Sequence, residues 1–356
     1  MRIALHVGQL TQPVPGGIAR YVRALLRELP RHDIEPVPFA AAPRPRGVTG
    51  DYVDLGWPRG SIRYEAWHRL RRPTLDVPGD IVHAPSLAVP PVRRRPLVVT
   101  AHDVAFHRFP DATTARGRAF HERGLALARR HAALVVAPSE FTRSELIELG
   151  FAPDRLAVAH LGTDPPIDLS ADDIDRRIRA LDLERPFVLT VGTVEPRKRI
   201  DRLVAAHALV RRDHPDLDLV VVGPRGWGDV GNLDGAGVRV TGALPWPAID
   251  ALYRRAVVCA IPSVYEGFGL PAVEAMHRGC PVVVASGSAT AEVVGNAGLV
   301  APADDTDALA ECIARVVDDA ELRADLVAAG RLRAQRWTWA RCGAEHAAIF
   351  TRLVGG

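Results

Sequence analysis

Short apolar runs, many of them β-branched, alternate along the chain with longer stretches in which apolar residues recur at helical spacing. Uninterrupted apolar runs are typical of strands buried on both faces, as in a parallel sheet covered by helices. The runs predict strands at 2–7, 34–39, 81–84, 97–101, 133–137, 156–160, 187–191, 217–222, 238–241, 257–261, 282–285 and 298–300. Helices are predicted between them, for example at 18–29, 114–131, 200–211 and 305–317.

This pattern holds too many strands for one compact sheet, and 356 residues is about the length of two ordinary domains. A polar, acidic segment with a Pro-Pro break interrupts the pattern in the middle of the chain. We therefore predict an α/β fold of two facing, Rossmann-like domains, each a doubly wound parallel sheet. The predicted boundaries are 1–165 for the first domain, 166–185 for a linker, 186–336 for the second domain and 337–356 for a final helix.

The composition excludes several classes of protein. Hydrophobic residues make up 47% and charged residues 24%, as in globular proteins, which excludes disordered and fibrous chains. No apolar run is long enough for a spanning helix, and the amino terminus lacks the pattern of a signal peptide. The net charge of +3 is too small for a nucleic-acid binder by charge alone. We therefore expect a cytoplasmic protein without a nucleic-acid partner.

The most specific motif is SVYEGFGLPAVE in the second half, which follows a predicted strand and opens a predicted helix. Pro271 suits a first helical turn, which leaves the N–H groups of Gly269 and Leu270 available to an anion. Glu266 and Glu274 flank the turn, and each carboxylate can accept hydrogen bonds from paired hydroxyls. Two solvated glutamates beside a capping turn would not explain the glycines, the proline and the preceding strand together.

A basic pair, Arg197 and Lys198, follows the strand predicted at 187–191 and precedes a helix. A guanidinium fork and an ammonium group both suit phosphate oxygens, so the pair is a candidate diphosphate site. Lys198 is the only lysine among the 45 lysine and arginine residues, which favours a specific role over that of an exposed base.

Two weaker candidates lie in the first half. Gly16 and Gly17 come after the first strand and before a helix, where backbone N–H groups can approach a phosphate, although a Gly-Gly pair is most often a turn. His102 and Asp103 follow the strand predicted at 97–101, where a histidine is more often structural than catalytic. Neither pair would be singled out without further information.

That information comes from a resemblance over nearly the whole chain. SVYEGFGLPAVEAMHRGCPVVVAS resembles the signature of the retaining glycosyltransferases of family 4, which have the GT-B fold. VPGGIARYVRALLREL, VVTAHDVAFH and LTVGTVEPRKRIDRLV are similar, in order, to this family's glycine loop, its histidine segment and the opening of its nucleotide-binding domain. Thr193 departs from the pattern, because members with a VGR-type start have an arginine there, which leaves Arg197 as the substitute.

The resemblance implies a GT-B fold whose last helix crosses back to the first domain. It implies transfer of a hexose from a nucleotide-sugar, with GDP-mannose as first choice, to a glycan, lipid-linked or small-molecule acceptor with retention of configuration. Attack from the same face, assisted by the leaving phosphate, is expected, because no carboxylate stands out as a nucleophile. No metal or other cofactor is expected, since the chain has no DxD-type motif in a fitting place.

The resemblance also assigns roles to the candidate residues. Glu274 would hold the ribose and Glu266 the hydroxyls of the donor sugar, while His102, oriented by Asp103, would face that sugar. The diphosphate would lie on Arg197, Lys198 and the Gly16-Gly17 turn. The nucleotide-sugar would also contact the turn at Gly267, Phe268, Gly269 and Leu270.

Alternatives remain at this point. A sugar-nucleotide epimerase of GT-B architecture, a glycogen-synthase-like polymerase and a non-catalytic nucleotide-sugar binding protein would share these motifs. The arginine-rich, aromatic stretch 57–72 has two interpretations. Tyr64, Trp67 and Arg71 would share one helical face and could contact an anionic membrane peripherally, at the inner face of the plasma membrane. Equally, the helix could be solvated, with its aromatic residues packed inward.

Overall fold

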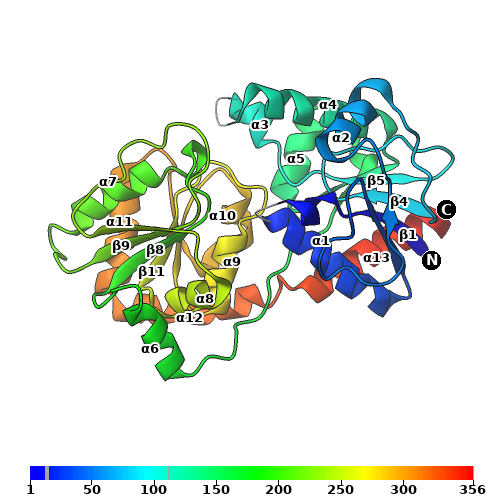
Figure 1. Cartoon of the computed structure of the whole chain (residues 1–356). Coiled ribbons are helices and arrows are strands. Elements are labelled where there is room, and N and C mark those ends of the chain that lie inside the picture. Colours follow the sequence, from blue (N-terminus) through cyan, green and yellow to red (C-terminus); the bar gives the residue numbers. More distant parts are fainter. Residues whose placement is uncertain (13–15, 111–112, 356) are drawn as a thin grey trace. The chain divides into compact units, whose positions relative to one another are not determined.

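The predicted strands form two parallel sheets, each in its own unit of the chain (Figure 1). The computed structural model describes residues 1–12, 16–110 and 113–355. The first unit comprises Met1–Pro110, Thr114–Gly162 and the segment from Thr338 onward, and the main part of the second unit is Thr163–Trp337. The fold class predicted from the sequence, two doubly wound parallel-sheet units, is confirmed.

The first sheet has seven parallel strands in the order β3-β2-β1-β4-β5-β6-β7. Their bounds are β1 (Arg2–His6), β2 (Glu35–Ala40), β3 (Val53–Asp54), β4 (Ile81–Ala84), β5 (Leu97–Thr100), β6 (Leu134–Ala137) and β7 (Leu156–Val158). All except β3 were predicted within two residues or so of these bounds. The two residues of β3, at the sheet edge, are too few to give an apolar run.

The second sheet has six parallel strands in the order β10-β9-β8-β11-β12-β13. Their bounds are β8 (Phe187–Val191), β9 (Asp218–Val222), β10 (Val238–Gly242), β11 (Val258–Ile261), β12 (Val282–Ala285) and β13 (Leu299–Ala301). In both sheets the strand order reverses beside the first strand, between β1 and β4 and between β8 and β11. Loops diverge at such a reversal, and ligands of open α/β sheets bind there.

Helices cover both faces of each sheet (Figure 1). Those of the first unit are α1 (Gly17–Glu28), α2 (Gly60–Leu70), α3 (Ala105–Arg108), α4 (Ala115–His131), α5 (Glu140–Glu148) and α13 (Trp339–Gly355). Those of the second are α6 (Ala171–Arg179), α7 (Ile200–Val210), α8 (Trp246–Arg255), α9 (Leu270–His277), α10 (Ala289–Val294), α11 (Thr306–Asp318) and α12 (Ala320–Ala334). Several begin with a side-chain cap, such as Ser139, whose hydroxyl accepts from Thr142 N at 3.0 Å.

The segment predicted as a linker, 166–185, contains α6 and is fastened to the second unit. Its anchor is Asp250 on α8, a fully buried carboxylate. Asp250 accepts from Ile167 N at 3.1 Å, from Arg254 Nε at 2.7 Å and from Arg278 Nε at 2.6 Å. Because the carboxylate is surrounded by charged and polar donors, its burial is compensated.

The last helix, α13, completes the first unit by packing against α1. His346 Nδ1–H donates to the carbonyl of Cys342 at 2.8 Å, so Nε2 must accept from the Tyr21 hydroxyl at 2.6 Å. Tyr21 in turn lies 2.9 Å from the hydroxyl of Thr100 at the end of β5, and Thr100 lies 2.9 Å from His83 Nε2 on β4. This buried chain of hydrogen bonds joins α13 to α1 and to the centre of the sheet.

Candidate functional site

The candidate site lies at the carboxyl ends of β8 and β11, at the point where the strand order of the second sheet reverses. The chain leaves β8 and forms the 3₁₀ turn η5 (Pro196–Lys198) before α7, and it leaves β11 toward α9. A backbone hydrogen bond of 3.1 Å from Val264 N to Arg197 O joins the two loops. Two segments more than sixty residues apart are thereby held in register.

Four charged side chains meet between these loops. Lys198 Nζ donates to Glu266 Oε1, and Arg197 Nη1 donates to Glu266 Oε2 at 3.1 Å. Arg197 also donates to the carbonyl of Tyr265 at 2.6 Å and, through Nη2, to Glu195 Oε1 at 2.5 Å. The structure therefore brings together three residues that the sequence singled out and adds Glu195, a buried carboxylate that it did not.

The cluster holds Glu266 in its ionised form. Burial by itself would raise the pKa of this carboxyl, but the charges of Lys198 and Arg197 and the hydrogen bond from Lys198 lower it to about 2. The two positive charges of Arg197 and Lys198 offset the two negative charges of Glu195 and Glu266. An incoming diphosphate would compete with Glu266 for Lys198 and Arg197, so the carboxylate and a phosphate are alternative partners of the same cations.

The glycine-rich turn leads directly from this cluster into α9. Gly269, the residue that caps α9, has a φ of 96°, a left-handed conformation that disfavours side chains. A Cβ at this position would also lie 2.6 Å from Thr290 Oγ1. Phe268 is buried with its ring edge-on to Trp337, 5.6 Å between centroids. The turn is thus fixed by packing, and in the first turn of α9 only the Leu270 N–H lacks a partner within the helix, because Pro271 has no N–H and Ala272 N donates to Gly269 O at 3.0 Å.

Glu274 lies on α9, beyond the turn, and is buried. Its Oε2 accepts from the hydroxyl of Tyr253 at 3.0 Å. Burial and the nearby carboxylate raise the pKa of Tyr253 well above its ordinary value, so the phenol stays protonated and donates. Glu274 is therefore oriented by a core tyrosine, whereas Glu266 is oriented by the cations.

Two hydroxyl groups near the turn were not singled out in the sequence. Ser288 and Thr290 are buried, and their hydroxyl oxygens have no hydrogen-bond partner among the described residues. The backbone of this segment reaches the site, because Ala289 N donates to Glu266 O at 3.2 Å. These residues follow β12, far from the motif in sequence, so no local pattern could have indicated them. Glu195 could have been found, as an acid beside a basic pair.

In the first unit, His102 follows β5 and its Nε2 lies 3.0 Å from the carbonyl of Pro85. Because a carbonyl only accepts, Nε2 carries the proton and Nδ1 is an acceptor. Burial lowers the pKa of His102, despite the opposing effects of Pro85 and Asp103, so the ring is neutral at pH 7. Asp103 Oδ1 accepts from Ala105 N at 3.1 Å at the start of α3.

Gly16 is the residue that caps α1, and Gly17 is the first residue of that helix. Gly16 is in an extended conformation, and a Cβ added to it would meet no atom of the described residues within 4 Å. With respect to those residues, the start of α1 is open. Its first turn carries no acidic side chain, which leaves the positive end of the helix uncompensated there.

The described residues offer neither a metal-binding cluster nor a membrane-spanning helix. Among the described residues, no group of three or more histidine, cysteine, aspartate or glutamate side chains is arranged to hold a metal ion. The helices in the described ranges also include none with the length and apolar character needed to cross a membrane.

Comparisons with known proteins identify the family of the chain. The family model for glycosyltransferase family 4 matches residues 15–166, and the model for glycosyl transferases group 1 matches residues 171–333. The chain is 33% identical over 301 residues to the O-antigen chain mannosyltransferase B of Escherichia coli, covering 79% of this chain and 75% of the relative.

It is also 30% identical over 390 residues to a D-inositol 3-phosphate glycosyltransferase of Frankia alni, covering 94% of this chain and 95% of the relative. Among solved structures, Anabaena HepE in complex with UDP and glucose superposes with a TM-score of 0.75 at 20% identity, over 99% of this chain and 100% of that one. The chain therefore belongs to the family 4 glycosyltransferases and has their GT-B fold.

Proposed function

We propose that this glycosyltransferase moves a hexose from a nucleotide-sugar to an acceptor hydroxyl with retention of configuration. The observation that carries the proposal is the meeting of Arg197, Lys198 and Glu266 where the strand order of the second sheet reverses. A diphosphate and a sugar are the two halves of a nucleotide-sugar that such a group of charges can hold.

The basic pair would stabilise the leaving diphosphate. As the bond between the anomeric carbon and the phosphate oxygen breaks, negative charge grows on the diphosphate. Arg197 is already positioned by Tyr265 and Glu195, so its fork needs little reorganisation. Lys198 and Arg197 would exchange Glu266 for phosphate oxygens, and the released carboxylate could then accept from hydroxyls of the transferred sugar.

Retention follows from attack on the face that the diphosphate leaves. The acceptor oxygen bonds to the anomeric carbon while the phosphate oxygen departs, and the acceptor proton passes to that phosphate oxygen. Glu195 is poorly suited to act as a nucleophile because it is paired with Arg197, and the released Glu266 is assigned to the sugar hydroxyls.

The remaining candidate residues would complete the binding of the donor. Glu274, oriented by Tyr253, would accept from the ribose hydroxyls. Nδ1 of the neutral His102 would accept from a hydroxyl of the donor sugar, and the open start of α1 at Gly16 and Gly17 would receive phosphate. Ser288 and Thr290 add hydroxyls near the turn.

The first choice of donor is GDP-mannose, which the relationship to a bacterial mannosyltransferase supports. A glycan or lipid-linked acceptor fits the same relative. An inositol phosphate is a second candidate acceptor, because the Frankia relative is described as a D-inositol 3-phosphate glycosyltransferase. We further propose that the enzyme acts in the cytoplasm and needs no metal.

The test is a thermal-shift screen with GDP, UDP, ADP and dTDP, followed by incubation with labelled sugar donors with and without acceptors. GDP should give the largest shift, and a response to UDP alone would refute the choice of GDP. Turnover that requires an acceptor supports transfer. Donor conversion without an acceptor would indicate an epimerase, and binding without any turnover would indicate a non-catalytic protein.

A further inference from the structure

Three histidine rings from distant parts of the first unit lie around Tyr21 on α1. His83 comes from β4, His102 follows β5 and His346 lies on α13. Their ring centroids are 6.4, 5.0 and 5.4 Å, respectively, from that of Tyr21. Of these four residues, only His102 has a role in the proposed transfer, and Tyr21 is the residue that contacts it from α1.

The phenol of Tyr21 is fixed in place. Tyr21 is fully buried, and burial raises its pKa well above the ordinary value, so the hydroxyl stays protonated. The hydroxyl donates to Nε2 of His346 at 2.6 Å, and its oxygen lies 2.9 Å from Oγ1 of Thr100, two residues before His102. Contacts with α13 and with the end of β5 therefore set the orientation of the ring.

The ring of Tyr21 in turn lies against the ring of His102. The two ring planes meet at 84°, the edge-to-face arrangement that aromatic pairs favour. His102 also donates from Nε2 to the carbonyl of Pro85 at 3.0 Å. A single hydrogen bond allows an imidazole to tilt, whereas the hydrogen bond and the Tyr21 ring together fix its plane. They thereby also fix the direction in which Nδ1 of His102 points.

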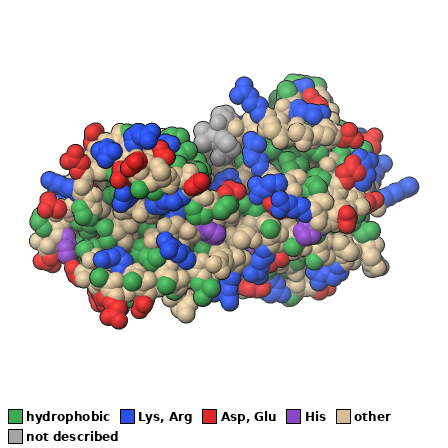
Figure 2. Space-filling view, turned by 90° about the horizontal axis from the view of Figure 1, so that it is seen from below, with side chains coloured by type: hydrophobic (Ala, Val, Ile, Leu, Met, Phe, Trp, Pro, Cys, Tyr) green, Lys and Arg blue, Asp and Glu red, His purple; other side chains and the backbone are tan. Residues whose placement is uncertain are grey.

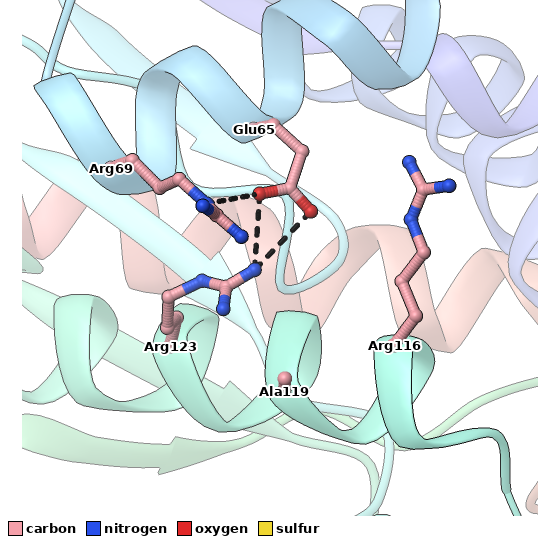
Figure 3. A pocket seen from close by; sticks show the side chains of 5 residues that line it. All are labelled: Glu65, Arg69, Arg116, Ala119 and Arg123. Atoms are coloured by element: carbon pink, nitrogen blue, oxygen red, sulfur yellow. Dashed lines mark hydrogen bonds and ion pairs between the residues drawn. The ribbon is translucent and has the colours of Figure 1, made fainter.

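The backbone around His102 is held by other contacts. After His102 the chain forms α3, where the ring of Phe106 stacks on His121 of α4, with 5.2 Å between centroids. Helix α4 is fastened to α2 by Glu65, which accepts from Arg123 Nη2 at 3.0 Å (Figure 3). Since these contacts hold the segment, what remains to be set at His102 is the orientation of its ring.

Helix α2 is itself held on its inner side by aromatic packing. Trp67 is fully buried, and both Tyr64 and Trp67 lie against the ring of His6. Arg71 also turns inward and donates to the carbonyl of Val89 at 3.0 Å. The face that these residues share is therefore packed against the protein, as the second interpretation of the stretch 57–72 predicted. On the face shown in Figure 2, basic and acidic side chains are mixed, so charge singles out no partner there.

We propose that Tyr21 is a positioning residue for the transfer: its ring holds the imidazole of His102 so that Nδ1 faces a hydroxyl of the donor sugar. This inference rests on the proposed function, in which Nδ1 accepts from that hydroxyl. An acceptor that is already oriented needs no reorganisation when the sugar binds, and a small error in its direction weakens the hydrogen bond.

Calorimetric titration with GDP-mannose and with GDP tests the proposal. Tyr21→Leu removes the ring contact and should weaken GDP-mannose binding about fivefold, the contribution of one neutral hydrogen bond. GDP carries no sugar, so its affinity should stay within about twofold of the wild type. His102→Ala should lose the same factor for GDP-mannose, and Tyr21→Leu should cost nothing further in that background, because Tyr21 acts through His102. Losses that multiply, or an equal loss for GDP, would overturn the proposal.

Two variants separate positioning from general support of the fold. Tyr21→Phe breaks both hydrogen bonds of the hydroxyl but keeps the ring against His102, so the Tm should fall while GDP-mannose affinity drops by no more than about twofold. Phe39→Leu is the matched control, because Phe39 is equally buried and its ring lies against His6 instead. It should lower the Tm and leave GDP-mannose affinity unchanged. A loss of affinity in either variant as large as that in Tyr21→Leu would overturn the proposal.

NMR of the full chain labelled with ¹⁵N in its histidine rings gives a readout that does not depend on the donor. The signals of His102, identified by their loss in His102→Ala, should report the Nε2–H tautomer in the wild type and a mixture of tautomers in Tyr21→Leu. Unchanged signals in Tyr21→Leu would overturn the proposal. If the signals change but His102→Ala binds GDP-mannose like the wild type, the positioning holds and the proposed role of His102 in transfer fails, so the two failures are distinguishable.

Discussion

Replacing Glu266 by glutamine should strengthen the binding of a nucleoside diphosphate and yet slow transfer of the sugar. Glutamine has nearly the shape of the carboxylate but carries no charge. In the wild type, Glu266 is bound to Lys198 and Arg197, the two cations proposed to hold the diphosphate. The substitution therefore removes a competitor for these cations along with a partner of the sugar.

The magnitude follows from the pKa of the carboxyl. Its fall from 4.5 to about 2 means that the surroundings favour the charged form by roughly 3 kcal/mol, at about 1.36 kcal/mol per unit. If the diphosphate takes about half of that interaction, competition costs roughly 1–2 kcal/mol, or on the order of tenfold in affinity. Loss of a charged acceptor for the sugar hydroxyls should slow turnover of the donor by roughly 10- to 100-fold, since such a bond contributes about 1.5–3 kcal/mol.

Calorimetric titration with the diphosphate that gives the largest thermal shift measures the first effect, and steady-state kinetics with the matching sugar donor measures the second. Glu274→Gln is the control, because Glu274 is held by Tyr253 and should lose diphosphate affinity through the ribose. Diphosphate binding by Glu266→Gln that is equal to the wild type or weaker would refute competition for the cations. A matching loss in both variants would mean that the two glutamates share one role.

Three other predictions concern the proposed leaving-group site, acid stability and metal. Lys198→Ala should lower kcat by about a hundredfold or more with little change in KM, while Lys198→Arg should retain part of the activity. Near-normal turnover of the alanine variant in steady-state assays would count against a role of Lys198 at the diphosphate. Burial lowers the pKa of His6 and of His346 to about 4. The unfolded chain therefore binds protons that the folded chain does not, and stability should be complete above about pH 6.5 and fall toward pH 4 by about 1.4 kcal/mol per unit for each ring. Urea unfolding at pH 7 and pH 5 measures this slope, which should become shallower in His346→Gln. Activity should survive EDTA, and inactivation that added metal reverses would contradict metal-independent transfer.

The sequence was informative where the chemistry is local. Strands buried on both faces leave uninterrupted apolar runs, so the sheets could be predicted almost to the residue. The motif SVYEGFGLPAVE, at the start of α9, contains a proline, a glycine in the left-handed conformation and two carboxylates. Arg197 and Lys198 lie in the loop that follows β8, and a parallel sheet brings the ends of neighbouring strands to one edge, so their meeting with Glu266 could be anticipated.

Other features depend on contacts that sequence alone does not reveal. Thr290 lies against Gly269 of the turn, and it comes from the segment that follows β12 in the chain. On α2, arginine suggests a solvated position, but Arg63 is buried and donates to the carbonyls of Leu55 and Pro58. The polar and apolar faces of this helix could therefore not be told apart by residue type.

Because α13 belongs to the first unit, the chain of that unit is discontinuous, and this affects how the protein is made. The second unit begins and ends at one place, where Thr163 N donates to Trp337 O at 3.1 Å. A ribosome completes all its residues before α13 emerges, so the second unit can fold during synthesis. The first unit cannot complete its fold at that stage. The side of α1 that carries Tyr21 stays uncovered until the segment that carries His346 has been synthesised. A fragment of residues 163–337 is consequently a natural unit for expression, whereas residues 1–162 alone would display an apolar surface and a broken hydrogen-bond chain.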